Sequence, residues 1–484
     1  MLIFNYAPHS LTYVELSVNG IFGRAYIFHN GEIYTLYFSL GDHGQVVKEL
    51  RKENPMDAQD NSVALKRREF LTLGMAGMTG VTLASLASIA EGAEGKAAIP
   101  ETFTMFPGNY TWSAAVRGAI SSCMYGGGDL GEIYKVCAAL QGKVGQNTAW
   151  FEEWNKMGER VALLGDQAKA KGHVQTASAA YMRAANYIEI GERLRQPRTS
   201  ETQKAYAQAV ELFKKGLPDV PFLSIEAVEV PFEGGRSLPA YFVRKAGAEM
   251  IKWPAVVFFD GLDVTKEIQY FRGVPEFTKR GMACLILDGP GNGESIRFRG
   301  MPARHDSEVA GSAAIDYLEK RGDVDKDRIG VMGISLGGYF APRAAAFEKR
   351  FRACVAWGAQ YDYHAVWKKR FEAAFKGSLS VPGEHIFWFL GVDNMEAALK
   401  KLEPFTLEGV AGKIECPFLL THGEEDAQIS TETARKQFAE VGAKDKTFKI
   451  FTREEGGSEH CQGDNLTLGI TYIADWLSDK LRTR

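Results

Sequence analysis

The chain has 484 residues, of which 45% are hydrophobic and 24% are charged. This is ordinary globular composition, and the length suits two or three domains. The net charge of −3 and the pI of about 6.4 indicate no basic surface for a nucleic acid, so we expect no nucleic-acid partner.

The spacing of cysteine, histidine and acidic residues does not indicate a metal site. The six cysteines include no C-x-x-C pair, and His, Asp and Glu nowhere repeat at ligand spacing. We therefore expect no metal and no organic cofactor. The cysteines lie in apolar stretches, which favours buried free thiols, with a disulfide such as Cys123 to Cys137 as the alternative.

Residues 56–95 carry the features of an export signal. Lys66-Arg67-Arg68-Glu69-Phe70-Leu71 resembles the twin-arginine motif, and the uncharged segment 71–89 follows it. Ser88-Ile89-Ala90 has the small-x-small pattern of a cleavage site. We predict a twin-arginine signal peptide, the twin-arginine translocase as a partner during export, and a periplasmic location. The alternative is a transmembrane or core helix.

The position of this signal inside the chain predicts a later start. Residues 1–55 precede Met56, whereas a signal peptide belongs at the N-terminus. We expect Met56 to be the native start and residues 1–55 to be translated upstream DNA. The alternative is a small β-rich domain, because residues 12–18 and 32–38 alternate like strands. N-terminal sequencing of the native protein distinguishes the two.

Residues 100–217 are predicted to form an all-helical domain. Helical periodicity marks residues 148–171 and 174–194, and a third helix, 200–215, ends just before a glycine. No second copy recurs at a fixed period, which argues against a solenoid. We expect this domain to act as a cap that covers the domain after it.

Residues 218–484 are predicted to form the catalytic domain, a mostly parallel, doubly wound α/β sheet. A hairpin is expected for residues 222–232 and 238–244. Two antiparallel strands followed by alternating strands and helices predict this sheet. Further strands are expected at residues 254–259, 282–287, 329–332, 353–357, 417–421 and 447–451, and helices at 271–280, 305–321 and 470–480.

Gly333-Ile334-Ser335-Leu336-Gly337 lies between a predicted strand and a predicted helix. A serine in a sharp strand-to-helix turn needs small flanking residues, which the two glycines supply. This context places the Leu336 amide at the helix start, where it can donate a hydrogen bond to an oxyanion. The segment therefore predicts Ser335 as a nucleophile. Without the strand and the helix, the same motif would fit a glycine-rich turn equally well.

Two later loops supply the partners that such a serine needs. Asp426 follows the next-to-last predicted strand as the candidate acid, and His460 follows the last one as the candidate general base. Serine after the third parallel strand, then acid, then histidine is the order typical of an α/β-hydrolase fold. We expect Glu424 and Glu425 to be solvated and His422 to be structural.

The second oxyanion donor is expected in the loop after the strand 254–259. This loop reads Asp260-Gly261-Leu262-Asp263, and we assign the donor to the Leu262 amide, with Gly261 as the alternative. The glycine-rich segment 288–295 lacks the G-K-[ST] of a phosphate loop, so we expect it to shape the mouth of the site.

Several of these segments together resemble a known group of enzymes. Across residues 110–480 the chain resembles 2,6-dihydroxypseudooxynicotine hydrolase and the fungal polyketide-shortening hydrolases of the yellowish-green pigment type. The resemblance implies a helical cap on an α/β-hydrolase core, often in a dimer, with Ser335, Asp426 and His460 as the triad. It also implies hydrolysis of a carbon–carbon bond next to a ketone in a small apolar or aromatic substrate. The segments are Asp260 to Glu267, Asp288 to Glu294, Gly333 to Gly338 and Glu459 to Cys461.

A further acid is implied by the same resemblance. The nicotine-pathway relative has a glutamate shortly after the strand that follows the nucleophile, but residues 357–367 offer only Asp362 and His364 here. Asp362 is therefore the candidate accessory acid, with a helix N-cap as the alternative. Aromatic residues between 361 and 402 are expected either to line an apolar pocket or to pack the cap onto the core. They include Trp367, Phe371, Phe375, Phe387, Trp388 and Phe389.

Two other functions fit the same residues. An esterase or lactonase would use the same triad and differ only in the leaving group. A non-catalytic binding or regulatory protein on a hydrolase fold would have no need for all three triad residues, and a fluorophosphonate probe distinguishes it from an enzyme.

Overall fold

The computed structural model describes five strands within residues 2–53 and, beyond them, residues 103–247, 252–374 and 379–482. Residues 1–99 make up one unit and residues 100–484 another. The five strands form an antiparallel sheet in the order β1-β2-β3-β4-β5. They are β1 Leu2–Asn5, β2 Ser10–Leu16, β3 Phe22–His29, β4 Glu32–Leu40 and β5 Val46–Glu53.

The sheet β1–β5 contains the two alternating segments noted in the sequence. The presence of these strands gives no information about where translation begins, so the start at Met56 stays a prediction. The expected signal peptide, residues 56–95, lies outside the described residues. Among the helices that the structure describes, none combines the length and the apolar character of a membrane span.

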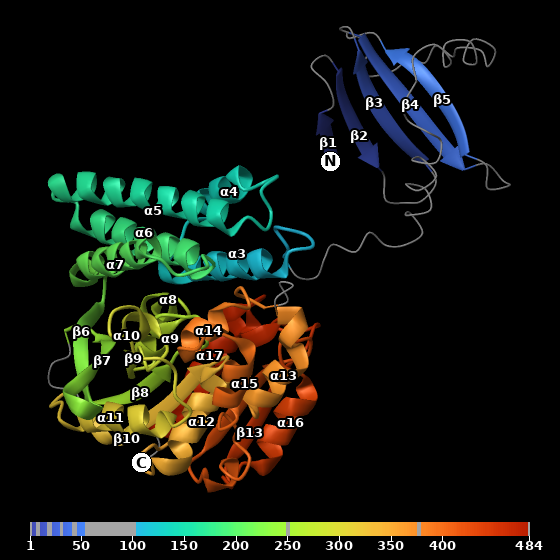
Figure 1. Cartoon of the computed structure of the whole chain (residues 1–484). Coiled ribbons are helices and arrows are strands. Elements are labelled where there is room, and N and C mark those ends of the chain that lie inside the picture. Colours follow the sequence, from blue (N-terminus) through green and yellow to red (C-terminus); the bar gives the residue numbers. More distant parts are fainter. Residues whose placement is uncertain are drawn as a thin grey trace. The chain divides into compact units, whose positions relative to one another are not determined.

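Five helices form a layer over the rest of the second unit (Figure 1). The three helices predicted from periodicity are confirmed as α5, α6 and α7. Helices α3 and α4 add two elements that the sequence analysis did not assign. Their bounds are α3 Tyr110–Ser122, α4 Leu130–Ala139, α5 Asn147–Ala170, α6 Val174–Arg193 and α7 Ser200–Gly216.

Small and aromatic residues hold the helical layer together. A Cβ atom added at Gly158 of α5 would lie 2.4 Å from a side-chain carbon of Ile188 on α6, so the two helices approach closely only because this residue is glycine. The buried Trp150 ring lies 4.8 Å from Trp112 of α3 and 5.4 Å from Trp154. The aromatic stripe of α5 is therefore core.

The second unit is built on an eight-stranded sheet in the order β13-β12-β11-β10-β8-β9-β7-β6. Strands β8 to β13 pair in parallel, and β7 and β6 extend the sheet antiparallel at one edge. The predicted hairpin and all six predicted parallel strands are confirmed. The strands are β6 Leu223–Phe232, β7 Arg236–Lys245, β8 Trp253–Phe259, β9 Ala283–Leu287, β10 Val324–Ile334, β11 Cys354–Trp357, β12 Phe418–Gly423 and β13 Lys446–Phe451.

The helices of the sheet domain differ from the prediction mainly around residue 273. The expected helix 271–280 is shorter and begins at Val274, because Gly273 has a φ of 106° and is not helical. The other two predicted helices are confirmed as α11 and α17. The helices are α8 Lys266–Tyr270, α9 Val274–Lys279, α10 Gly293–Arg297, α11 Ser307–Glu319, α12 Gly337–Phe347, α13 Tyr363–Ala374, α14 His385–Leu390, α15 Met395–Leu402, α16 Thr431–Glu440 and α17 Leu466–Arg482.

Buried charges tie the helical layer to the sheet domain. Glu192 of α6 accepts a hydrogen bond from Arg297 of α10 at 2.8 Å and also pairs with Arg198. Burial alone would raise the pKa of Glu192, but the two guanidinium groups outweigh it and lower that pKa to about 2. Breaking such a pair leaves an uncompensated buried charge, so these contacts fix the layer in place.

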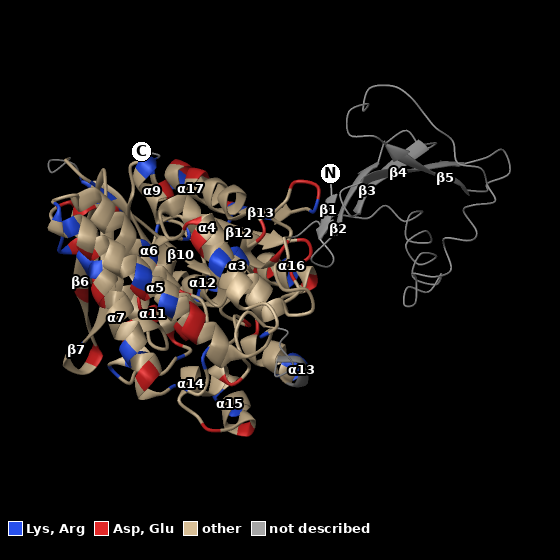
Figure 2. Ribbon diagram, turned by 90° about the horizontal axis from the view of Figure 1, so that it is seen from above, with Lys and Arg blue, Asp and Glu red and all other residues tan. Residues whose placement is uncertain are grey.

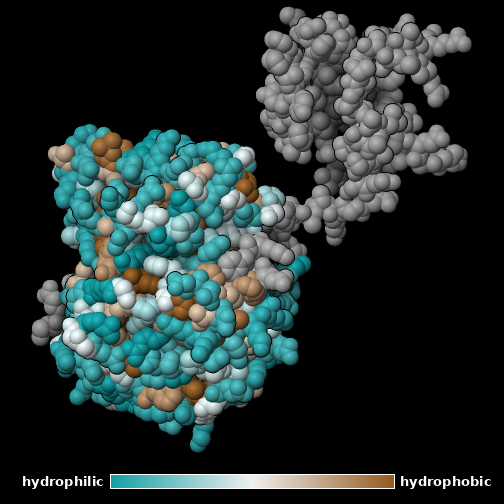
Figure 3. All heavy atoms as spheres, in the orientation of Figure 1, coloured by the Kyte–Doolittle hydropathy of each residue, from teal (hydrophilic) through white to brown (hydrophobic). Residues whose placement is uncertain are grey.

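Basic and acidic residues are interspersed along the helices of the second unit (Figure 2). Hydrophilic residues cover most of one face, and hydrophobic residues gather mainly where the helical layer meets the sheet domain (Figure 3). All six cysteines are free thiols.

Candidate active site

Ser335 occupies a strained turn between β10 and α12. Its φ is 57°, a conformation that few non-glycine residues adopt. A Cβ atom at Gly333 would lie 2.3 Å from the Gly337 carbonyl oxygen, and one at Gly338 would lie 1.8 Å from the Gly358 carbonyl oxygen. The backbone closes this tightly only with glycine at both positions, as a nucleophile elbow requires.

The structure brings Ser335, His460 and Asp426 into one chain of hydrogen bonds. His460 Nε2 lies 2.8 Å from Ser335 Oγ, and His460 Nδ1 lies 2.7 Å from Asp426 Oδ2. Asp426 Oδ1 accepts hydrogen bonds from the amides of Gln428 at 2.8 Å and Ile429 at 3.0 Å. These two amides therefore orient the Asp426 carboxylate toward the imidazole. Ser335, His460 and Asp426 have the geometry of a nucleophile, a base and an orienting acid.

The electrostatics of this chain suit a base. Burial alone would lower the pKa of His460, but the adjacent Asp426 carboxylate outweighs it and raises that pKa well above the ordinary value. Burial alone would raise the pKa of Asp426, but His460 outweighs it and lowers that pKa. Asp426 is thus ionised at neutral pH and stabilises the imidazolium that forms when His460 takes a proton.

The neighbouring charged residues have the roles expected of them. Glu425 pairs with Arg453, and both Glu424 and Glu425 are exposed. His422 is fully buried, and its Nε2 lies 3.1 Å from the Ile429 carbonyl oxygen. Glu424 and Glu425 are therefore solvated loop residues, and His422 is a buried structural histidine.

The loop after β8 lies directly against the nucleophile. A Cβ atom at Gly261 would lie 3.3 Å from Ser335 Cβ and 3.8 Å from its Oγ. Leu336, the N-cap of α12, and Leu262 are both buried. No residue in the described ranges accepts a hydrogen bond from the amide of Leu336 or Leu262. Both amides therefore stay candidates for an oxyanion hole.

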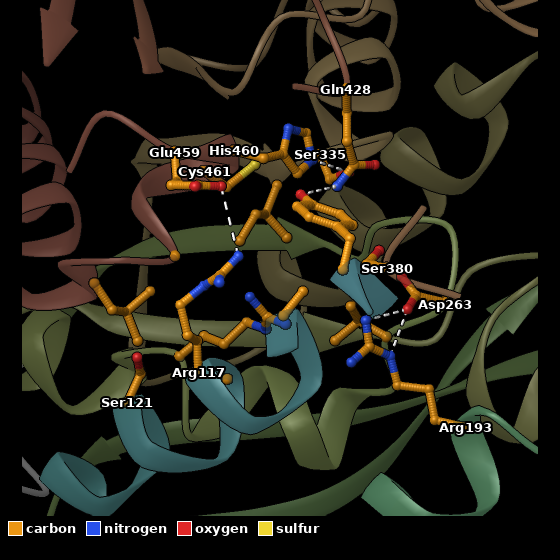
Figure 4. A pocket seen from close by; sticks show the side chains of 18 residues that line it. Arg117, Ser121, Arg193, Asp263, Ser335, Ser380, Gln428, Glu459, His460 and Cys461 are labelled. Carbon is orange, nitrogen blue, oxygen red and sulfur yellow. Dashed lines mark hydrogen bonds and ion pairs between the residues drawn. The ribbon is translucent and has the colours of Figure 1, made fainter. Parts of the chain in front are cut away.

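Asp362 and His364 do not line the pocket at Ser335. The Asp362 carboxylate accepts the Ala365 amide at 2.8 Å, at the start of α13, so this side chain is an N-cap. Residues of the helical layer and of the triad loops line the pocket instead (Figure 4). Helix α3 contributes Tyr110, Ala114, Arg117, Gly118 and Ser121, and α6 contributes Arg193. The layer thus covers the site as expected.

Trp367, Trp388 and Phe389 pack within the protein instead of lining the pocket, whereas Phe375 lies outside the described residues. Trp388 lies beneath the guanidinium groups of Arg198 and Arg297, at 4.7 and 5.0 Å from their central carbons. Phe389 lies against Gly291, and Trp367 is 1% exposed. For these three residues the packing alternative is therefore confirmed, and the described pocket at Ser335 includes several charged side chains.

Several residues that line the pocket were not predicted from the sequence. Gln428 and Glu459 adjoin the triad residues in sequence, so their positions next to Asp426 and His460 were the available signal. Tyr110 and Arg117 lie on α3, whose periodicity carries no mark of a site. The Tyr110 hydroxyl accepts a hydrogen bond from Gln428 at 3.5 Å, and Arg117 lies 3.5 Å from Glu459.

Comparisons with known proteins agree with this geometry. The model of the prolyl oligopeptidase family matches residues 267–483. The crystal structure of 2,6-dihydroxy-pseudo-oxynicotine hydrolase superposes with a TM-score of 0.63 at 26% identity, covering 75% of this chain and 96% of that one. The chain has the α/β-hydrolase fold and is similar to hydrolases of that fold.

Curated relatives of this α/β-hydrolase include fungal enzymes. Hydrolase acrC of Aspergillus aculeatus is 29% identical over 402 residues, which are 73% of this chain and 92% of that protein. The 20-hydroxy-prefusarin hydrolase FUS2 of Gibberella moniliformis is 28% identical over 395 residues, 72% of this chain and 92% of that protein. The resemblance inferred from the motifs is therefore confirmed, and the chain is a hydrolase.

Proposed function

We propose that this α/β-hydrolase uses Ser335 to cleave a carbon–carbon bond next to a ketone in a small substrate. The hydrogen-bonded chain Ser335–His460–Asp426, on the floor of a capped pocket, carries the proposal. The likeness to 2,6-dihydroxy-pseudo-oxynicotine hydrolase over 75% of the chain supports this bond type. An ester or lactone is the alternative substrate, and it would use the same three residues.

In the proposed reaction, Ser335 Oγ attacks the carbonyl carbon while His460 takes its proton. The carbon–carbon bond breaks and its electron pair passes to the leaving carbon, which must take up a proton. Once His460 has passed this proton on and is neutral again, water attacks the acyl-serine with His460 as base, and His460 then returns a proton to Ser335 Oγ as the acyl bond breaks. The products are a carboxylic acid and a ketone, and one water is consumed.

Glu459 is the side chain that we propose as the proton donor to carbon. Two carboxylic acids line the pocket, Asp263 and Glu459. Burial alone would raise the pKa of Asp263, but Arg193 outweighs it and lowers that pKa. Burial raises the pKa of Glu459, and Arg117 opposes this only in part. An acid whose pKa is raised beside one that stays ionised is suited to protonate a leaving group. Before water attacks, transfer of the proton from His460 to the Glu459 carboxylate would restore both the base and the acid.

The proposal is tested with two substrate classes. We expect cleavage of an aryl β-diketone, 1-phenyl-1,3-butanedione, to fall about 10²- to 10⁴-fold in Glu459→Gln, the range typical of general acid catalysis. A phenolate leaving group needs no proton on carbon, so p-nitrophenyl ester turnover should change less than about tenfold. Asp362→Asn is the control, because asparagine caps a helix equally well.

Initial rates and chromatography of the products measure both reactions. Serine-dependent ester turnover with an inert diketone would establish the esterase alternative. An equal fall of both activities in Glu459→Gln would contradict the role of Glu459.

The cellular location of the protein, its oligomeric state and the start of its native chain are also proposals. We propose export by the twin-arginine route to a periplasm, on the basis of residues 66–71, with a start at Met56. A homodimer is proposed from the enzyme resemblance. Comparing the cell fractions for the mature protein and measuring its mass in solution test these proposals.

A further inference from the structure

Three arginines line the pocket at Ser335, together with two carboxylic acids. They come from three different segments: Arg117 from α3, Arg193 from α6 and Arg272 from the turn between α8 and α9. The lining therefore carries an excess of positive charge. Because the pocket is covered by the helical layer, this charge is poorly screened by solvent.

Two of these arginines have carboxylate partners inside the protein (Figure 4). Arg117 lies 3.5 Å from Glu459, and Arg193 forms a close ion pair with Asp263. The Arg193 and Asp263 side chains are only 9% and 8% exposed. These two pairs use both of the acids that line the pocket.

Arg272 differs from the other two. Within the described residues, its guanidinium forms no ion pair or hydrogen bond, and its Nε atom is buried without an acceptor. Burial lowers the pKa of Arg272, and the neighbouring Arg193 lowers it further, while Asp263 acts in the opposite direction. The Arg272 side chain is partly exposed to the cavity. A buried guanidinium N–H without an acceptor costs free energy, and an anionic ligand in the cavity would remove that cost.

The backbone around Arg272 is held rigidly. Phe271 is 1% exposed, and its ring lies 5.7 Å from Phe213 of the helical layer. A Cβ atom at Gly273 would lie 2.5 Å from a side-chain carbon of Ile470 on α17. Both neighbours of Arg272 are therefore packed in the core, and the arginine is presented to the cavity from a fixed point, which favours a preorganised contact.

We propose that Arg272 binds an anionic oxygen of the substrate, either a carboxylate or the enolate of a 1,3-diketone, beside Ser335. A guanidinium donates two parallel hydrogen bonds to such a group. The assignment rests on the proposed function, because it places the bound anion on the molecule that Ser335 attacks. It narrows the substrate class to compounds that carry a negative charge near the scissile carbonyl.

Calorimetric titration of the full chain tests this site without turnover. Benzoate and benzamide have the same shape and differ in charge. We expect wild type to bind benzoate about 10- to 100-fold more tightly, the range for a hydrogen bond to a charged group. Arg272→Gln should abolish this preference, Arg272→Lys should keep part of it, and the exposed Arg236→Gln should match wild type.

A second pair of probes distinguishes the two sources of charge. This pair is titrated into Ser335→Ala, which cannot turn the diketone over. We expect the enolate of 1-phenyl-1,3-butanedione to bind more tightly than neutral 1-phenyl-1-butanone if the ligand is an enolate. Benzoate alone would show the preference if it is a carboxylate. Equal binding within both pairs, a preference that survives in Arg272→Gln, or no binding of any probe would overturn the proposal. Since calorimetry needs no reaction, these results are independent of whether Ser335 proves catalytic.

Discussion

Replacement of Ser335 with alanine is expected to lower kcat on the order of 10⁶-fold, as removal of a triad serine does in other serine hydrolases. The reason is geometric. Ser335 Oγ is held by a strained turn at 2.8 Å from His460 Nε2, and among the described contacts no other hydroxyl forms a hydrogen bond with the imidazole. Without Oγ, neither the acyl-enzyme nor the proton transfer to His460 can occur.

The matched control for this substitution is Ser380→Ala. Ser380 lines the same pocket, but it forms no hydrogen bond with His460 or Asp426 among the described contacts. We expect its kcat to stay within about tenfold of wild type, since removal of a neutral hydroxyl costs little. Initial rates on the p-nitrophenyl ester and on the β-diketone measure both variants. Substantial activity in Ser335→Ala would contradict the account.

The second large effect is expected for Asp426→Asn, with a fall in kcat on the order of 10⁴-fold, because the amide holds the wrong tautomer of His460. This substitution also changes the pH dependence. His460 acts as a base only when neutral, so activity is lost as pH falls through its pKa, which Asp426 raises. The acidic limb of kcat/KM in wild type should therefore lie above the ordinary histidine range.

In Asp426→Asn the acidic limb is expected to move to lower pH, because the carboxylate that favours the imidazolium is gone. Asp362→Asn removes a carboxylate from the same domain but not from the site, and it should leave both kcat and the limb unchanged. A full pH profile of kcat/KM measures the shift. A limb at the wild-type position in Asp426→Asn would mean that Asp426 does not set the protonation of His460.

Much of the catalytic core could be predicted because its signals are local. Gly333 and Gly337 flank Ser335 at a strand end. A Cβ atom at either position would lie too close to a backbone carbonyl oxygen, so no larger residue fits. Asp426 and His460 could be assigned because the order of parallel strands places their loops at the same edge of the sheet as Ser335. Strand alternation and glycine turns are properties of a few neighbouring residues, which the sequence shows directly.

The polar pocket could not be predicted for the opposite reason. Arg117, Arg193 and Arg272 come together only through packing of the helical layer on the sheet domain, and no short segment contains two of them. Trp388 and Phe389 gave a false signal, since aromatic residues serve core packing and ligand pockets equally well. Asp362 has the residue type of an acid, but the start of α13 uses it as a cap.

The central claim is that Ser335 is the nucleophile of this α/β-hydrolase. Its most direct test is to treat the full chain with a fluorophosphonate probe and to identify the labelled residue by peptide mass spectrometry. We expect one adduct on Ser335. The adduct should be absent in Ser335→Ala, and labelling should be much slower when His460 is replaced by alanine. No adduct in wild type would favour a non-catalytic protein on a hydrolase fold, and an adduct on a different serine would contradict the assignment of the site.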